Sequence, residues 1–182
     1  EDQPTWNIWE YEIASRQLRR VIQSDIVAEE GHDVAPHYLP DGRIVFSSTR
    51  QRQARAILLD EGKPQFAAQD EDRAEPAFVL HVMNGDGSGL RQISFNQSHD
   101  LDPAVLDDGR IVFSRWENAG PNNEINLYTV RPDGTGLELL YGAQSHATGT
   151  DDGDVHFLEP RPAAPGRVVA LAQPFRAPDL GA

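Results

Sequence analysis

The sequence contains no cysteine and no long hydrophobic run. Without cysteine, the chain itself cannot form disulfide bonds, thiolate zinc sites or a covalent haem attachment through Cys-x-x-Cys-His. The compartment stays undetermined, because cysteine-free proteins occur in reducing and in oxidising surroundings. The longest apolar candidate, residues 76–83, is far shorter than a membrane-spanning helix. We therefore expect no membrane insertion.

Basic residues are scarce as well. Sixteen Lys and Arg stand against 29 Asp and Glu, which gives a net charge of −13. We expect no nucleic-acid partner, because phosphate binding needs a concentrated basic surface. Binding to an anionic membrane surface is disfavoured for the same reason. The chain of 182 residues is 38% hydrophobic, which is enough for a core. It has neither an initiator methionine nor a signal peptide, so we expect a processed form or a fragment.

What the sequence does contain is a repeat. "HDVAPHYLPDGRIVFSST" at 32–49 returns as "HDLDPAVLDDGRIVFSRW" at 99–116. Each copy is followed by a second shared segment, "FVLHVMNGDGSGLRQI" at 78–93 and "INLYTVRPDGTGLELL" at 125–140. Residues 8–22 and 160–171 resemble parts of the same unit. A repeat of this length is typical of a propeller blade or a solenoid unit.

The repeated unit is composed of strands. "RIVFS" is β-branched and aromatic and follows a tight-turn Asp-Gly, while "INLYTV" alternates as a half-buried strand does. The Gly-rich turns "GDGSG" and "PDGTG" lead into a further strand, and a fourth is expected around the His-Asp-x-x-Pro segment. The sequence therefore predicts an all-β fold, a β-propeller of four-stranded blades.

The repeat also predicts how the chain is divided. The predicted parts are propeller blades over 1–171 with units near 8–48, 78–114 and 125–171, an insertion at about 49–76, and a Pro-rich tail or linker at 172–182. Within the insertion, "RQARAILLDEG" predicts a short helix that ends at Gly62. About three to four blades are fewer than most closed propellers need. We therefore expect a partial propeller completed by further sequence or by another chain; a four-bladed ring closed by the N-terminal strands is the alternative.

The paired motifs resemble those of the TolB-like β-propeller repeat, over about residues 8–171. More narrowly, "SFNQSHDLDPAVLDDGRIVFSRWENAG" and "LYTVRPDGTGLELLYG" are similar to the propeller-bearing proteins related to the hydrazine synthase alpha subunit. The resemblance implies a bacterial protein of the periplasm or the extracellular space. In hydrazine synthase c-type haems perform the chemistry, and no haem motif occurs here, so no catalytic residue carries over.

The repeated histidines and aspartates are the candidate site. The candidate residues are His32, Asp33, His99, Asp100 and His146. Equivalent positions of successive blades lie at equivalent radius, so these groups could form part of a ring that binds a metal ion or a small polar ligand. Alternatively, each His-Asp pair bonds the neighbouring blade or caps a turn. Ala147 takes the place of the aspartate after His146, which weakens the metal hypothesis.

Other chemistry has little support. Asp86 and Asp133 lie in turns that lack the ligand spacing of a calcium loop, and there is no phosphate loop or Gly-x-Ser-x-Gly elbow. We therefore expect a non-catalytic binding or scaffold module with a protein partner, and no cofactor beyond that metal ion. The alternative is a domain or subunit of a larger enzyme, either a multihaem oxidoreductase like hydrazine synthase alpha or a hydrolase, whose catalytic groups lie elsewhere.

Overall fold

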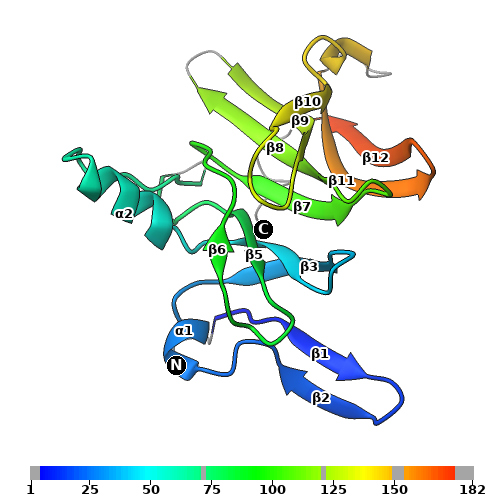
Figure 1. Cartoon of the computed structure of the whole chain (residues 1–182). Helices are drawn as coiled ribbons and strands as arrows, with labels where there is room; N and C mark the ends of the chain where they lie inside the picture. Colours follow the sequence, from blue (N-terminus) through cyan, green and yellow to red (C-terminus); the bar gives the residue numbers. More distant parts are fainter. Residues whose placement is uncertain (1–4, 71–72, 120–121, 149–153, 175–182) are drawn as a thin grey trace.

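The computed structural model describes residues 5–70, 73–119, 122–148 and 154–174. Its strands are β1 (Trp9–Glu12), β2 (Gln17–Arg20), β3 (Asp33–Tyr38), β4 (Ile44–Ser48), β5 (Val79–Met83), β6 (Arg91–Gln92), β7 (Asp100–Val105), β8 (Ile111–Ala119), β9 (Asn122–Val130), β10 (Glu138–Tyr141), β11 (Val155–Ala164) and β12 (Arg167–Pro174). The helices are α1 (Asp25–Ala28), α2 (Arg52–Asp60) and the 3-10 turn η1 (His146–Thr148). Antiparallel strands dominate (Figure 1), so the predicted all-β class is confirmed.

Two sheets are complete four-stranded blades. One has the order β3-β4-β5-β6 and the other the order β7-β8-β9-β10. β3 and β7 begin at the repeated aspartates, so the fourth strand expected around the His-Asp segment is present. Phe46 lies opposite His81 in the first blade, and Phe113 lies opposite Tyr128 in the second. The two copies of the repeat therefore fold with matching register.

The other two sheets are half-blades of opposite kinds. The Trp6 carbonyl before β1 accepts the amide N–H of Asp33 at 2.9 Å, as the Phe78 carbonyl before β5 accepts that of Asp100 at 2.8 Å. By this match β1 and β2 are the third and fourth strands of a blade. β11 and β12 follow the second complete blade and are the first two strands of the next. The chain is thus a partial β-propeller. Its two complete blades lie between a half-blade of third and fourth strands, β1 and β2, and a half-blade of first and second strands, β11 and β12.

A bulge at the same place identifies each first strand. Ala35, Asp102 and Glu159 have φ of 50°, 52° and 48°, and the pairing register shifts beside each of them. The segment "HFLEP" at 156–160 is therefore the third copy of the repeated His-x-x-x-Pro phrase. The prediction that His146 is the third copy was wrong, because a longer connection between β10 and β11 moves the motif further along the chain.

The boundaries of the sheets do not coincide with the boundaries of the predicted units. Unit 8–48 contains the first half-blade together with β3 and β4, and unit 125–171 likewise spans two sheets. β12 runs to Pro174, so the first residues of the predicted tail, 172–182, belong to a strand. Residues 175–182 lie outside the described residues.

β11 includes two prolines, Pro160 and Pro162. Among the described strands β11 pairs only with β12, so its other edge tolerates a missing backbone N–H.

The core lies between successive sheets. One cluster joins the two complete blades: Leu39, Val45, Leu80, Val82, Ile93, Ile111, Phe113 and Val130. A second joins the first half-blade and α1 to blade one: Ile8, Val21, Ile22, Ala28, Ile44, Phe46 and Met83. Trp116 and Ile125 pack on Leu158, and Leu127 packs on Val155 and Phe157, which seats β11 on blade two. Each sheet thus buries its apolar face against its neighbour, as propeller blades do.

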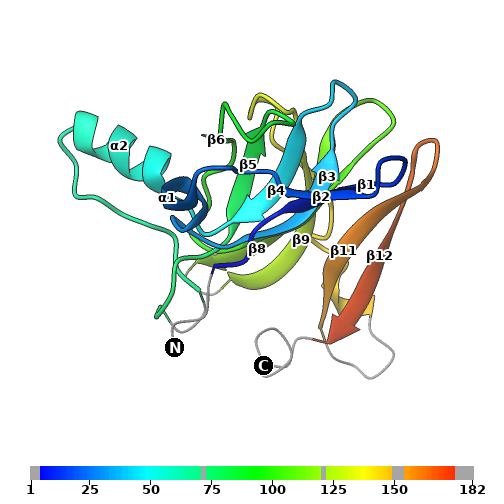
Figure 2. The same ribbon diagram turned by 90° about the horizontal axis from the view of Figure 1, so that it is seen from below.

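The predicted insertion separates β4 from β5 and contains the predicted helix, α2. Gly62 follows the helix at φ 65°, the left-handed position that terminates it. No residue of α2 is buried, and Figure 2 shows the helix standing away from the sheets on the side opposite the β11–β12 hairpin. The Gln51 side chain fixes the base of the insertion, because its Nε2 donates to the carbonyls of Ala68 and Ala77, each at 2.9 Å.

Candidate functional site

The repeated histidines connect neighbouring sheets. Nδ1 of His32 accepts the backbone N–H of Trp6, and Nδ1 of His99 accepts that of Phe78, both at 3.1 Å. His156, at the third position, accepts the N–H of Ile125 at 2.9 Å. Trp6 and Phe78 lie just before the third strand of the preceding sheet, and Ile125 lies within that strand, β9. The contacts agree with the alternative in which the His-Asp segment bonds the neighbouring blade.

The two aspartates hold buried arginines. Asp33 accepts from Arg50 Nε at 2.9 Å and from Arg50 Nη2 at 2.7 Å, and Asp100 accepts from the same two atoms of Arg115 at 2.8 and 2.9 Å. Both pairs are almost fully buried. The arginines stand at different offsets from the repeated Ile-Val-Phe-Ser, which is why comparison of the two copies did not reveal them. In the third copy, Phe157 replaces the aspartate.

His146 lies apart from these pairs, in η1. Its Nδ1 contacts the Val155 carbonyl, and its Nε2 lies 2.9 Å from Asn126 Oδ1 and 3.5 Å from a Glu124 carboxylate oxygen. The structure therefore does not bring the five candidate residues together. Within the described ranges, no group of three His, Cys, Asp or Glu side chains is placed to hold a metal ion.

Charged groups that the sequence did not single out lie on the first strands of the sheets. Burial raises the pKa of Asp102, nearby Glu159 raises it further, and Arg161 opposes both. Burial, followed by the charge of Arg161, lowers the pKa of His37. The bulges create this arrangement, because they turn the residues at 102 and 159 out of the regular alternation of a strand. A simple period-two pattern cannot predict that.

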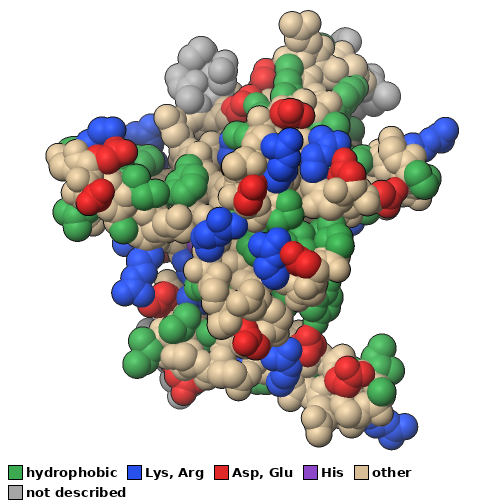
Figure 3. All heavy atoms as spheres, in the orientation of Figure 1, with side chains coloured by type: hydrophobic (Ala, Val, Ile, Leu, Met, Phe, Trp, Pro, Cys, Tyr) green, Lys and Arg blue, Asp and Glu red, His purple; other side chains and the backbone are tan. Residues whose placement is uncertain are grey.

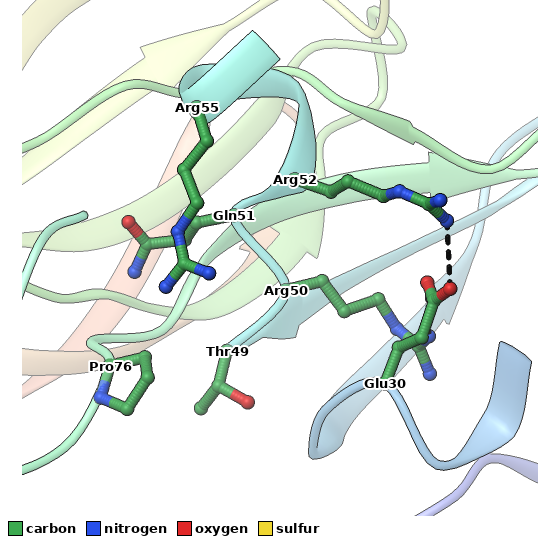
Figure 4. Close-up of a pocket in the computed structure, with 7 residues that line it drawn as sticks. All are labelled: Glu30, Thr49, Arg50, Gln51, Arg52, Arg55 and Pro76. Carbon is green, nitrogen blue, oxygen red and sulfur yellow. Dashed lines mark hydrogen bonds and ion pairs between the residues drawn. The ribbon is translucent and has the colours of Figure 1, made fainter. Parts of the chain in front are cut away.

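A second feature missed by the sequence is a groove beside the start of α2, the first hollow of which is shown in Figure 4. It consists of two hollows of about 380 and 460 Å³ that share Glu30, Arg50 and Arg52 in their walls. Arg55, Gln51, Thr49 and Pro76 complete the first hollow. The second extends to His81 of β5 and Gln92 of β6. Arg52 reaches across to Glu30 at 2.8 Å.

The half-blades expose strands that are buried elsewhere. β4 is wholly buried as the second strand of its blade and β5 as the third. Their counterparts β12 and β1 are mostly exposed: Val169 is 56% and Leu171 52% exposed, and Trp9 and Tyr11 are 57% and 55% exposed. Figure 3 shows hydrophobic side chains on the surface of the β1–β2 hairpin at lower right. Among the described strands β1 pairs only with β2 and β12 only with β11, whereas the second and third strands of a complete blade pair with each other.

No helix in the described part of the chain is long and apolar enough to cross a bilayer. Comparison of sequences gave no relative: no family model matches, and no curated protein sequence matches.

Comparison of folds found similar solved structures. Hydrazine synthase from Kuenenia stuttgartiensis aligns with 93% of this chain at a TM-score of 0.65 and 18% identity. A protein assigned as TolB from Agrobacterium tumefaciens aligns with 74% of the chain at a TM-score of 0.52 and 19% identity. The aligned part is only 26% of the hydrazine synthase chain and 40% of the TolB chain. The expected resemblance in fold to TolB-like and hydrazine synthase propellers is confirmed.

Proposed function

We propose that this chain is a non-catalytic β-propeller module that binds a protein partner as part of a larger assembly. The observation that carries the proposal is the contrast between blades and half-blades: strands that are buried in the complete blades are exposed in β1 and β12. An exposed strand with apolar side chains is an aggregation hazard unless something covers it.

The chemistry of these edges favours a polypeptide as the partner. A strand edge presents alternating N–H and C=O groups, and another strand satisfies both at the correct spacing. In the complete blades, the second strand pairs with the third along its length. A partner that offers a strand to β12 would complete its sheet in the same way and would cover Val169 and Leu171.

The setting we propose is the bacterial envelope or the extracellular space. This placement rests on the resemblance to TolB-like propellers and on the shared fold. The sequence without cysteine agrees with either setting.

The test uses the tagged chain in its native cell. In the variant V169K/L171K, the charges on β12 should prevent strand pairing, and recovery of the partner should fall at least tenfold. L59K is the matched control, because Leu59 is 63% exposed on α2, the helix that stands away from the sheets on the side opposite the β11–β12 hairpin (Figure 2). Circular dichroism of the three proteins checks that the fold is kept. Equal recovery of the same partner by all three would rule out β12 as the contact.

A second candidate function follows from the similarity to hydrazine synthase over 93% of this chain. The chain would then be the propeller part of a larger enzyme, with the catalytic groups outside it. The visible spectrum of the purified native assembly separates the two functions. A Soret band in an assembly that keeps this chain in fixed ratio would favour the enzyme, and its absence would favour the scaffold or a haem-free hydrolase.

A further inference from the structure

The free edges of β1 and β12 differ from the other strand edges of the molecule. In the complete blades, the first and fourth strands lie at the two ends of the sheet, and the second and third strands lie inside it. β12 is a second strand and β1 a third strand, so their free edges are inner positions of a blade. β1 and residues 167–173 of β12 contain no proline, so these edges keep their backbone N–H groups. The chain therefore carries the two complementary halves of one blade.

The half-blades have the same register as the complete blades. At one matching position of the third and fourth strands, the paired residues are His81–Gln92, Tyr128–Leu139 and Trp9–Arg20. At one matching position of the first and second strands, the paired residues are Asp33–Ser48, Asp100–Arg115 and Phe157–Ala172. The pairing of second with third strands in the complete blades therefore predicts which residue of β12 would lie opposite each residue of β1.

Side chains at the predicted positions complement each other. In the complete blades, a phenylalanine of the second strand lies opposite a ring of the third strand: Phe46–His81 and Phe113–Tyr128. The corresponding positions hold Ala170 on β12 and Trp9 on β1, so the smaller residue leaves room for the larger ring. Three positions further along, Arg167 would lie opposite Glu12, and both are exposed. Opposite charges placed directly across two strands stabilise their pairing.

A hollow beside the first half-blade lies where β12 of another copy would pack. It measures about 80 Å³, and its walls include Ile8, Val21, Tyr38 and Ile44. Their counterparts one blade further along pack with Val45 between the complete blades: Leu80, Ile93, Val105 and Ile111. Val169 holds the position of Val45 on β12, so this side chain, 56% exposed in the single chain, would enter the hollow. Glu10 also lines the hollow, and Arg19 neutralises it at 2.8 Å.

The number of blades indicates how many copies are needed. Two half-blades and two complete blades amount to three blades per chain, whereas closed propellers have roughly four to eight. One copy therefore cannot close a ring, two copies supply six blades, and three copies supply more than the usual range.

We propose that the partner of the half-blades is a second copy of this chain, an inference that rests on the proposed binding of a polypeptide there. Two copies would close a six-bladed propeller, in which β12 of each copy pairs with β1 of the other. The same contact then forms twice about a twofold axis, which is the commonest symmetry of protein oligomers.

The mass of the purified chain is the first test. Sedimentation velocity over a range of protein concentrations should show a reversible species of twice the monomer mass. Two differently tagged copies that are expressed together should be recovered as one complex. V169K/L171K should stay monomeric, because its charges lie in both contacts, and circular dichroism checks that its fold is kept.

Arg167 and Glu12 test the predicted register. R167E places two carboxylates opposite each other in both contacts, so it should weaken the dimer about tenfold, and E12R should do the same with two cations. The double variant R167E/E12R restores opposite charges and should recover the affinity of the wild type. R55E, on α2 and away from both half-blades, is the matched control and should leave the dimer unchanged.

Two results would overturn the second copy as partner. One is a chain that stays monomeric at every concentration; the other is a dimer that R167E does not weaken or that R167E/E12R does not restore. The proposed function would then still hold if V169K/L171K loses a different polypeptide in the native cell. It would fail as well if no polypeptide depends on β12.

Discussion

At the scale of single residues, the repeated polar groups serve the contacts between sheets. His32 and His99 accept backbone N–H groups of the preceding sheet, and Asp33 and Asp100 hold buried arginines. Repetition made these residues conspicuous in the sequence. Such repetition is expected whenever a structural contact recurs in every blade, so it does not by itself distinguish a ligand site from a folding contact.

The ion pair in blade two provides a test of this role. Asp100→Ala leaves Arg115 buried without its counter-ion and should lower the free energy of unfolding by about 3–5 kcal/mol. Asp41→Ala removes an exposed carboxylate that pairs with the half-buried Arg43 and should cost less than about 1 kcal/mol. Urea unfolding followed by circular dichroism measures both changes.

The double variant D100L/R115L completes that test. Phe157 shows that the fold accepts an apolar side chain at the aspartate position, so removing both charges should restore much of the lost stability. A double variant as unstable as Asp100→Ala would contradict this account.

His81 makes stability depend on pH. Burial lowers its folded pKa to about 4, whereas the unfolded chain takes up this proton at about pH 6.5. Between these values the unfolded state binds more protons, so stability falls as the pH decreases, by about 3 kcal/mol over the whole interval.

His81→Phe should lack this component. The difference in unfolding free energy between the variant and the wild type, from urea titrations at pH 7 and pH 4, should therefore shift in favour of the variant as the pH falls. His37→Phe, at a less buried histidine, serves as the comparison. Parallel pH profiles for H81F and the wild type would contradict the prediction.

At the scale of elements, turns position each blade against its neighbour. The turn after β5 brings Gly87 so close to the first half-blade that an added Cβ would lie 2.4 Å from the Val21 carbonyl oxygen. Gly134 occupies the same place in the next blade, where a Cβ would lie 2.9 Å from the Ile93 carbonyl oxygen. The glycines in "GDGSG" and "PDGTG" therefore serve packing between sheets as well as the turn.

Gly42 and Gly87 form a matched pair for substitution. Both have φ of 84°, but a Cβ at Gly42 would meet nothing within 4 Å. Gly42→Ala should cost about 1 kcal/mol from backbone strain alone. Gly87→Ala should cost about 1–3 kcal/mol more, because a backbone carbonyl must also move. Equal losses in urea unfolding would show that the close approach to Val21 is not energetically important.

At the scale of the whole molecule, the two half-blades are the unfinished parts of the propeller. Each is a two-stranded sheet, whereas both blades between them have four strands. Stability in such an array comes from contacts between neighbouring units, so the terminal units should open first.

Amide hydrogen exchange tests this difference. In the chain alone, amides of β1 and β12 should exchange faster than those of β4 and β8, because their pairing and burial are one-sided. In the native assembly, protection should rise in β1 and β12 and stay unchanged in β4. Uniform protection across all four strands of the isolated chain would contradict the half-blade account.

The sequence by itself determined the repeated unit, its strands and turns, the helix in the insertion and the partial nature of the propeller. These follow from local signals: alternation in "INLYTV", Asp-Gly before "RIVFS", and Gly62 after α2. Such signals act within a few residues of each other, so one chain is enough to detect them.

Only the tertiary structure decided which histidine is the third copy, which arginines neutralise the aspartates, and where the groove lies. Arg50 and Arg115 occupy different offsets in their repeats, and the walls of the groove come from α1, α2, β5 and β6. These relations depend on how sheets pack across the core and on the length of the connection before β11. Packing joins residues distant in sequence, and no local pattern records that pairing.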